Sequence, residues 1–104
     1  MKDNLDCQLT LVLPVELEDE VIDLLRGLPD TVSGYSLLPA EGFGATAELT
    51  TMLEQVRGKA AQRMVQVLLQ QQQIEPLLAA LRAALPTPRI AWWVTPVLRC
   101  GSLA

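Results

Sequence analysis

The chain has 104 residues, half of them hydrophobic, and a formal net charge of −4. This length suits one domain with one hydrophobic core, so we expect residues 1–104 to fold as a single unit. The acidic balance argues against general nucleic-acid binding, which requires a basic surface. The apolar runs are too short to span a bilayer, and the first residues lack the apolar stretch of a signal peptide. We therefore expect a cytoplasmic protein without direct membrane insertion.

The first two elements are a predicted strand over residues 7–13 and a predicted helix after it. Every second residue of the strand is apolar, which is the period of a half-buried strand: Cys7, Leu9, Leu11 and Leu13. The helix is indicated by apolar residues at helical spacing, namely Leu17, Val21, Leu24, Leu25 and Leu28. Its many acidic residues are expected to face water, and Gly27, Pro29 and Asp30 end it.

A second strand is predicted over residues 33–39, and its Gly34 and Pro39 favour a place at the sheet edge. The next nineteen residues, 40–58, form a predicted loop. Connections in compact domains have a median of about 4–6 residues, and longer ones are usually functional or disordered. This loop is therefore where we expect function to lie.

The second half of the chain predicts strand, helix and strand. Residues 62–70 alternate again, with Arg63, Val65, Val67 and Leu69 on one face and Met64, Gln66 and Leu68 on the other. The glutamines at positions 70–73 are interpreted as a solvated turn. A helix is then indicated by Ile74, Leu77, Leu78, Leu81 and Leu85, and residues 89–98 form the last predicted strand.

These elements predict an α+β, ferredoxin-like βαββαβ fold, with a four-stranded antiparallel sheet and two helices on one face. The last strand is apolar on both sides, since Ile90, Trp92 and Val94 alternate with Ala91, Trp93 and Val97. An antiparallel sheet with one face in water alternates more cleanly between apolar and polar residues. We therefore expect the open sheet face to be covered by association into a homo-oligomer.

Five short stretches in this order resemble one family. They are PVELED at 14–19, SGY at 33–35, GFG at 42–44, EQVRG at 54–58 followed by Arg63, and WVTPV at 93–97. The chain resembles the PII signalling superfamily, and within it a small PII-like family of unknown function that is often encoded beside heavy-metal efflux pumps. The resemblance implies a homotrimer formed through the open sheet face, with a long mobile loop between the second and third strands.

The resemblance also implies an adenine-nucleotide site between subunits at the base of this loop. The candidate ligand-binding residues are Gly42, Phe43, Gly44, Gln55, Arg57, Gly58 and Arg63. Arg57 and Arg63 can pair with phosphate or another anion, and Phe43 can stack on a base. The alternative is a flexible loop with turn glycines, because a glycine pair without a strand-to-helix context is no nucleotide fingerprint.

Metal binding is a second hypothesis for this chain. Where the family resemblance implies a histidine between the two loop glycines, this chain has Phe43, and it contains no histidine at all. An imidazole metal ligand is therefore excluded. Cys7 and Cys100 lie at the ends of the first and last strands, which are neighbours in the strand order 4-1-3-2. Two thiolates there could hold a soft ion such as Cu(I), or both could be ordinary reduced thiols.

The functional prediction is a PII-like regulatory protein, not an enzyme. An adenine nucleotide or other anion would order the long loop and change its fit to a partner, and the family context implies a metal-efflux or other membrane transport system. One alternative is a cytoplasmic metal-binding protein that uses Cys7 and Cys100. Another is a small oligomeric enzyme with an intersubunit site, although the chain has no histidine base and no carboxylate pair with opposed pKa values.

Overall fold

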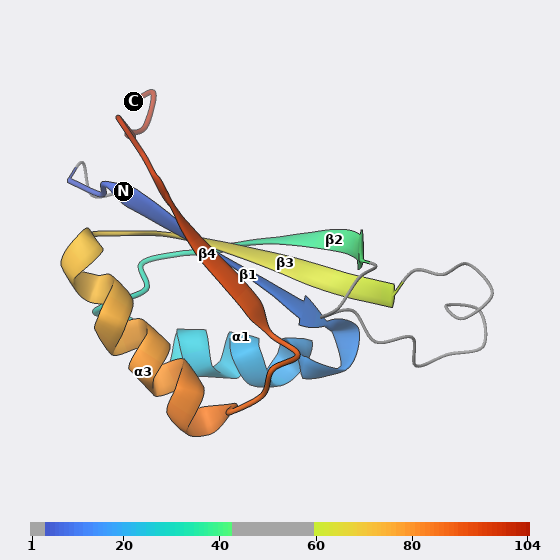
Figure 1. Ribbon diagram of the computed structural model, residues 1–104. Helices are drawn as coiled ribbons and strands as arrows, with labels where there is room; N and C mark the ends of the chain where they lie inside the picture. The colour runs from blue at the N-terminus through green and yellow to red at the C-terminus, as the bar shows by residue number, and fades with distance from the viewer. Residues whose placement is uncertain (1–3, 43–59) are drawn as a thin grey trace.

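A computed structural model describes residues 4–42 and 60–104. The strands and helices follow the predicted sequence of types: β1 (Cys7–Pro14), α1 (Glu18–Arg26), β2 (Ser36–Gly42), β3 (Ala60–Leu69), α3 (Ile74–Ala84) and β4 (Ala91–Pro96). Short 3-10 turns, η1 (Val15–Leu17) and η2 (Gln71–Gln73), lead into α1 and α3. Both helices lie on one face of the sheet (Figure 1). The predicted ferredoxin-like α+β fold is therefore confirmed.

The four strands form one antiparallel sheet in the order β2-β3-β1-β4, as the sequence predicts. Leu11 in β1 lies opposite Val65 in β3 on one side and Trp92 in β4 on the other. The strands β1 and β3 are therefore the two central strands of the sheet, and β2 and β4 are its edges. None of the helices in the described parts of the chain is long and apolar enough to cross a bilayer.

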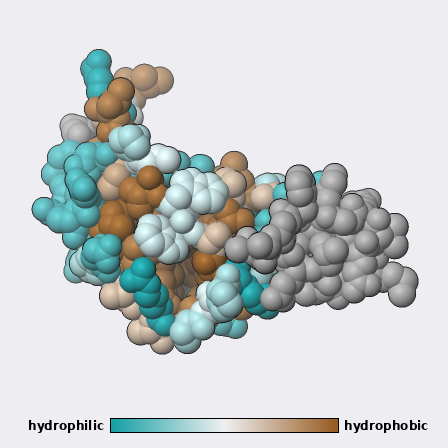
Figure 2. Space-filling view, viewed as in Figure 1, coloured by the Kyte–Doolittle hydropathy of each residue, from teal (hydrophilic) through white to brown (hydrophobic). Residues whose placement is uncertain are grey.

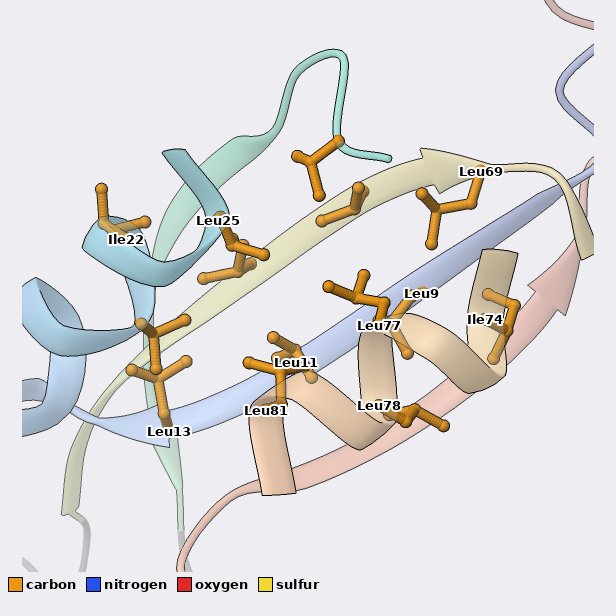
Figure 3. Close-up of a cluster of buried hydrophobic side chains, with 14 of the residues drawn as sticks. Leu9, Leu11, Leu13, Ile22, Leu25, Leu69, Ile74, Leu77, Leu78 and Leu81 are labelled. Atoms are coloured by element: carbon orange, nitrogen blue, oxygen red, sulfur yellow. The ribbon is translucent and has the colours of Figure 1, made fainter. Parts of the chain in front are cut away.

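The hydrophobic core fills the space between the sheet and its two helices (Figure 3). The strands contribute alternate residues that are at most 1% exposed, namely Leu9, Leu11, Leu13, Val65, Val67 and Leu69. The helices contribute Val21, Ile22 and Leu25 from α1 and Ile74, Leu77, Leu78 and Leu81 from α3. Burying one such side chain stabilises the fold by about 1.5–3 kcal/mol. The alternation and helical spacing of the sequence therefore identify most of this core, although the buried Ile22 was not predicted and Leu17, Leu24 and Leu28 are only partly buried.

The opposite face of the sheet carries the other half of each strand. Gln66 and Leu68 on β3 are half-buried, and Trp93 on β4 lies on this face because it pairs with Thr10. Within residues 4–42 and 60–104 both helices lie on the other side of the sheet, and this face remains open (Figure 1). The predicted two-sided apolar character of the last strand is therefore confirmed.

The second strand differs from its prediction in position. It was expected at residues 33–39, and it runs from Ser36 to Gly42. The amides of Thr31 and Val32 both donate to the carbonyl of Leu28, which holds the chain in a turn after α1. Val32 is buried by this turn, so the extended conformation begins later. Residues 40–42, expected in the long loop, therefore belong to the strand.

The glutamine tract is a turn with Gln71 and Gln72 exposed, as predicted. Residues Gln71–Gln73 form the 3-10 turn η2, which leads into α3. The backbone amide of Gln70 donates to Oε1 of Gln73 at 2.9 Å, and the two side chains form a reciprocal capping box. Such a box satisfies amides that a helix start leaves without a partner. The glutamines thus position the second helix.

Candidate functional site

The predicted ligand site lies at the end of the sheet where β2 stops and β3 begins. The structure describes two of its seven residues, Gly42 and Arg63. The other five fall outside the described residues: Phe43, Gly44, Gln55, Arg57 and Gly58. Gly42 pairs with Ala60 across the two strands, so the ends of the connection leave the sheet side by side. The described part of the site is therefore the base of the connection.

The side chain of Gln62 occupies the space beside Gly42. A Cβ atom at Gly42 would lie 1.8 Å from Oε1 of Gln62, closer than any real contact. Gln62 is only 6% exposed, so its amide has little room to move away. Gly42 was predicted to contact a ligand, and a glycine permits such close approach because it has no side chain. The structure shows that the approaching group is Gln62, a residue that the sequence analysis did not select.

Arg63 lies on the helix-covered face of β3, opposite Leu13 in β1 and Pro39 in β2. Its Nε donates to Oε1 of Glu18 at 2.7 Å, and its Nη1 donates to the carbonyl of Gln62 at 3.2 Å. The two side chains are 31% and 28% exposed, so the pair is partly shielded from water. The predicted anion-binding arginine is thus already held by a carboxylate of its own chain.

Glu18 was grouped by the sequence analysis with the solvent-facing acids of the first helix. It instead pairs with the candidate site residue Arg63, because α1 begins at Glu18 near the start of β3. A signal for this was present in the strand pattern. Arg63 alternates with Val65 and Val67, which places a cation on the core face, and a half-buried cation requires an anionic partner from the elements that cover that face.

A second ion pair lies at the same end of the sheet. Nη2 of Arg89, in the segment before β4, donates to Oε1 of Glu16 in η1. The segment after β1 is therefore linked to two others. Glu18 links it to β3, and Glu16 links it to the segment before β4. The PVELED stretch that carries part of the family resemblance supplies both carboxylates. This turn joins the loop base to the segment before β4.

The two cysteines lie at the opposite end of the sheet, since Cys7 starts β1 and Cys100 follows the end of β4. Cys7 pairs with Pro96, which confirms that the first strand neighbours the last. The Cys7 thiol donates to the carbonyl of Leu69 (Sγ···O 3.3 Å), and the Cys100 thiol donates to that of Leu5 (3.5 Å). Neither cysteine forms a disulfide.

The surroundings of Cys7 favour a protonated thiol. Burial raises the pKa of Cys7 above its ordinary value, and the carboxylate of Asp6 raises it further. Metal ligation requires the thiolate, which this environment disfavours. The described residues, 4–42 and 60–104, contain no cluster of three or more histidine, cysteine or acidic side chains that could hold a metal. Binding of a soft ion by Cys7 and Cys100 alone stays a prediction.

Comparison with known families and structures places this geometry in context. Residues 4–104 match the model of a family described as "Protein of unknown function (DUF3240)". No curated protein matches the sequence.

Among solved structures, the chain is similar to a DUF3240 family protein from Shewanella baltica OS155. The two are 23% identical, each is covered over 100% of its length, and the TM-score is 0.77. It is also similar to CPII from Thiomonas intermedia K12, described as a nitrogen regulatory PII-like protein bound to ADP, AMP and bicarbonate. Here the identity is 18%, the coverage is 99% of this chain and 100% of CPII, and the TM-score is 0.71. The apo form of CPII matches at 17% identity, 97% coverage of each chain and a TM-score of 0.66.

Proposed function

Because the chain belongs to the DUF3240 family, whose function is not known, we propose its function from its PII-like fold and from the base of the residue 43–59 connection. The protein is a cytoplasmic, non-enzymatic, trimeric regulator of the PII-like type. It binds an adenine nucleotide or another small anion between subunits. The ligand contacts are Gly42, Phe43, Gly44, Gln55, Arg57, Gly58 and Arg63.

The observation that carries this proposal is the position of Arg63. Arg63 lies at the end of the sheet from which the connection leaves, and about a third of its side chain is exposed. A guanidinium there can make bidentate hydrogen bonds to phosphate or carboxylate oxygens. Arg57 and Lys59 are close to Arg63 in the sequence, so more than one cation can approach the same ligand.

The similarity to CPII supports an adenine nucleotide as the ligand, because that protein is described as bound to ADP, AMP and bicarbonate. In this chain the ligand acts by ordering the connection between β2 and β3. Such a switch requires the ligand to bind the ordered state more tightly than the disordered one. The ordered connection then contacts a partner, for which we propose a metal-efflux system or another membrane transport system.

The trimer is proposed from the open face of the sheet. The two helices cover the centre of one face of the sheet, whereas Leu38 and Trp93 on the open face are 40% and 44% exposed. Association of three copies through this face removes these side chains from water and brings three loop bases together. The measurement is the mass in solution by light scattering, and a monomer at every concentration would contradict the trimer and the intersubunit site.

Calorimetric titration tests the ligand. We expect ATP, ADP, AMP or cyclic AMP to bind wild-type protein and Arg57→Ala to weaken that binding by about tenfold or more, because a charged hydrogen bond to phosphate is lost. Arg99→Ala is the matched control, since Arg99 is an exposed arginine beyond β4, away from the loop base. Titration with bicarbonate shows whether a small anion alone is sufficient. Equal nucleotide binding by wild-type and Arg57→Ala protein would show that the proposed site is wrong.

A further inference from the structure

The loop base differs in character from the surface around β4. Apolar surface gathers around β4 on the face shown in Figure 2, and it suits the association proposed above. At the loop base, by contrast, Arg63 of β3 pairs with Glu18, the first residue of α1. An arginine that is paired with a carboxylate must give up this partner before the same N–H group can bind another anion. The Glu18–Arg63 pair therefore bears directly on ligand binding.

The contact between these two side chains is a single hydrogen bond. Nε of Arg63 donates to Oε1 of Glu18 at 2.7 Å, and Nη1 of Arg63 donates to the backbone carbonyl of Gln62 at 3.2 Å. Within residues 4–42 and 60–104, these are the two hydrogen bonds of the Arg63 side chain. Glu18 therefore uses one N–H group of the guanidinium, and Nη2 is left for another acceptor.

An oxyanion can bind this arginine more completely than Glu18 does. The N–H groups of Nε and Nη2 point in parallel from one edge of a guanidinium, so two oxygens of one phosphate, carboxylate or bicarbonate accept from both. A ligand that takes the place of Glu18 thus exchanges one charged hydrogen bond for two. Glu18 and the ligand cannot share the edge, because two anions in contact repel each other.

Glu18 can leave Arg63 at little cost. Its side chain is 28% exposed, so the carboxylate reaches water without any change in the core. Glu18 also begins α1, where the positive end of the helix dipole stabilises a negative charge. An ion pair that water reaches contributes little to stability, and a well-placed ligand can therefore replace it.

We propose that Glu18 sets the affinity of the anion site. Its carboxylate holds Arg63, and a ligand oxyanion displaces it from the Nε and Nη2 edge of the guanidinium. The displacement rests on the proposed function, in which Arg63 contacts the ligand, and it adds a residue that this function gives no role. The internal carboxylate lowers the affinity for every anion, and an anion with two oxygens on one centre overcomes it best.

Calorimetric titrations with ADP, inorganic phosphate and bicarbonate test the displacement. Glu18→Gln removes the charge of the competitor, so this variant should bind these anions about two- to fivefold more tightly than wild-type protein, in line with the strength of a partly exposed ion pair. Glu20→Gln is the matched control, because it removes the same charge from an exposed position on α1. It should leave the affinity unchanged. Circular dichroism checks that both variants remain folded.

The gain in affinity must act through Arg63. In the Arg63→Met background, which lacks the guanidinium, adding Glu18→Gln should no longer tighten binding, and the four proteins form a double-mutant cycle. The displacement is wrong if Glu18→Gln binds no more tightly than wild-type protein, or if Glu20→Gln gives an equal gain. It is also wrong if the gain persists in the Arg63→Met background, since a general change in charge then explains it.

Comparison with Arg57→Ala separates the displacement from the proposed function. If Arg57→Ala weakens ADP binding while Glu18→Gln leaves it unchanged, the nucleotide site is supported and the displacement is rejected. If Arg57→Ala leaves ADP binding unchanged while Glu18→Gln tightens phosphate binding through Arg63, the displacement is supported and the nucleotide site is rejected. Failure of wild-type and Glu18→Gln protein to bind any of the three anions rejects both.

Discussion

The two faces of the sheet differ in how far the chain itself buries their side chains. On the helix-covered face, Leu9 and Val67 are fully buried by residues of the same chain. On the open face, Leu68 and Trp93 stay partly or largely exposed, and two polar residues, Thr10 and Gln62, are buried at 1% and 6% exposure. The centre of the helix-covered face is therefore a hydrophobic core, although Leu37 and Trp92 at its edges are 40% and 44% exposed. The open face combines apolar and polar groups in the way expected of a contact surface.

The largest expected effect is the difference in stability lost when a leucine is truncated on each face of the sheet. Leu9→Ala should lower the free energy of unfolding by about 2–5 kcal/mol, because it leaves a cavity in the core. Leu68→Ala on the open face is the matched control and should cost much less, since its side chain is already partly in water. Urea unfolding of dilute protein measures both. Equal losses would mean that the open face is as fully packed as the helix-covered one.

A second prediction concerns the open face at the loop base. Gly42→Ala should destabilise the protein by about 1–3 kcal/mol, because the new Cβ atom overlaps the buried side chain of Gln62. Gly34→Ala is the control, since no atom lies within 4 Å of its Cβ position, and it should be neutral or stabilising by about 0.5 kcal/mol.

The double variant Gly42→Ala/Gln62→Ala isolates the cause of this effect. If the overlap with Gln62 is responsible, adding Gly42→Ala to Gln62→Ala should cost little. Thermal unfolding of the four proteins completes the cycle. If Gly42→Ala costs as much stability in the Gln62→Ala background as in the wild type, the cause is the backbone at position 42 and not the overlap with Gln62.

A third, smaller effect concerns the ion pair between Glu18 and Arg63 on the helix-covered face. A double-mutant cycle of Glu18→Gln and Arg63→Met should give a coupling of roughly 0.5–1 kcal/mol, because the pair is partly shielded but still reaches water. The coupling should shrink as salt is added. Cycles measured by urea unfolding at low and high ionic strength check this, and a coupling near zero at low salt would show that the contact adds no stability.

The smallest expected effect is a pH dependence at the end of the sheet where Cys7 lies. Its pKa is raised by burial and by Asp6, so the folded state holds the thiol proton more tightly than the unfolded state. The resulting stabilisation is complete below the ordinary cysteine pKa and is lost as the pH rises through the folded value. Wild-type protein should therefore lose stability above about pH 9 faster than Cys7→Ala. Parallel slopes in alkaline urea titrations would contradict this.

Much of the fold was predictable from local patterns. The alternation from Cys7 to Leu13 and from Arg63 to Leu69 identified two strands and the face that each buries. The position of β2 was not predictable in the same way. The turn that holds Val32 in the core depends on backbone hydrogen bonds to Leu28, and those compete with strand formation at residues 33–35. The turn therefore moved the strand by three residues relative to its pattern.

The candidate site was likewise predictable in part from the sequence. Its location at the loop base followed from the unusual length of the connection and from the family resemblance. The partners of its residues did not follow, because Glu18 and Arg63 are 45 positions apart in the sequence. The contact between the Gln62 side chain and Gly42 did not follow from the sequence either. Contacts of this kind depend on the strand pairing and on where α1 begins above the sheet.

The amino-acid sequence by itself determined the kinds of element, most of the core residues and the two-sided character of β4, because side-chain periodicity is a local property of the chain. Only the tertiary structure decided that Arg63 is held by Glu18 and that the side chain of Gln62 lies beside Gly42. Those features arise when segments distant in the sequence pack together, and their geometry is set by sheet register and helix placement, not by spacing along the chain.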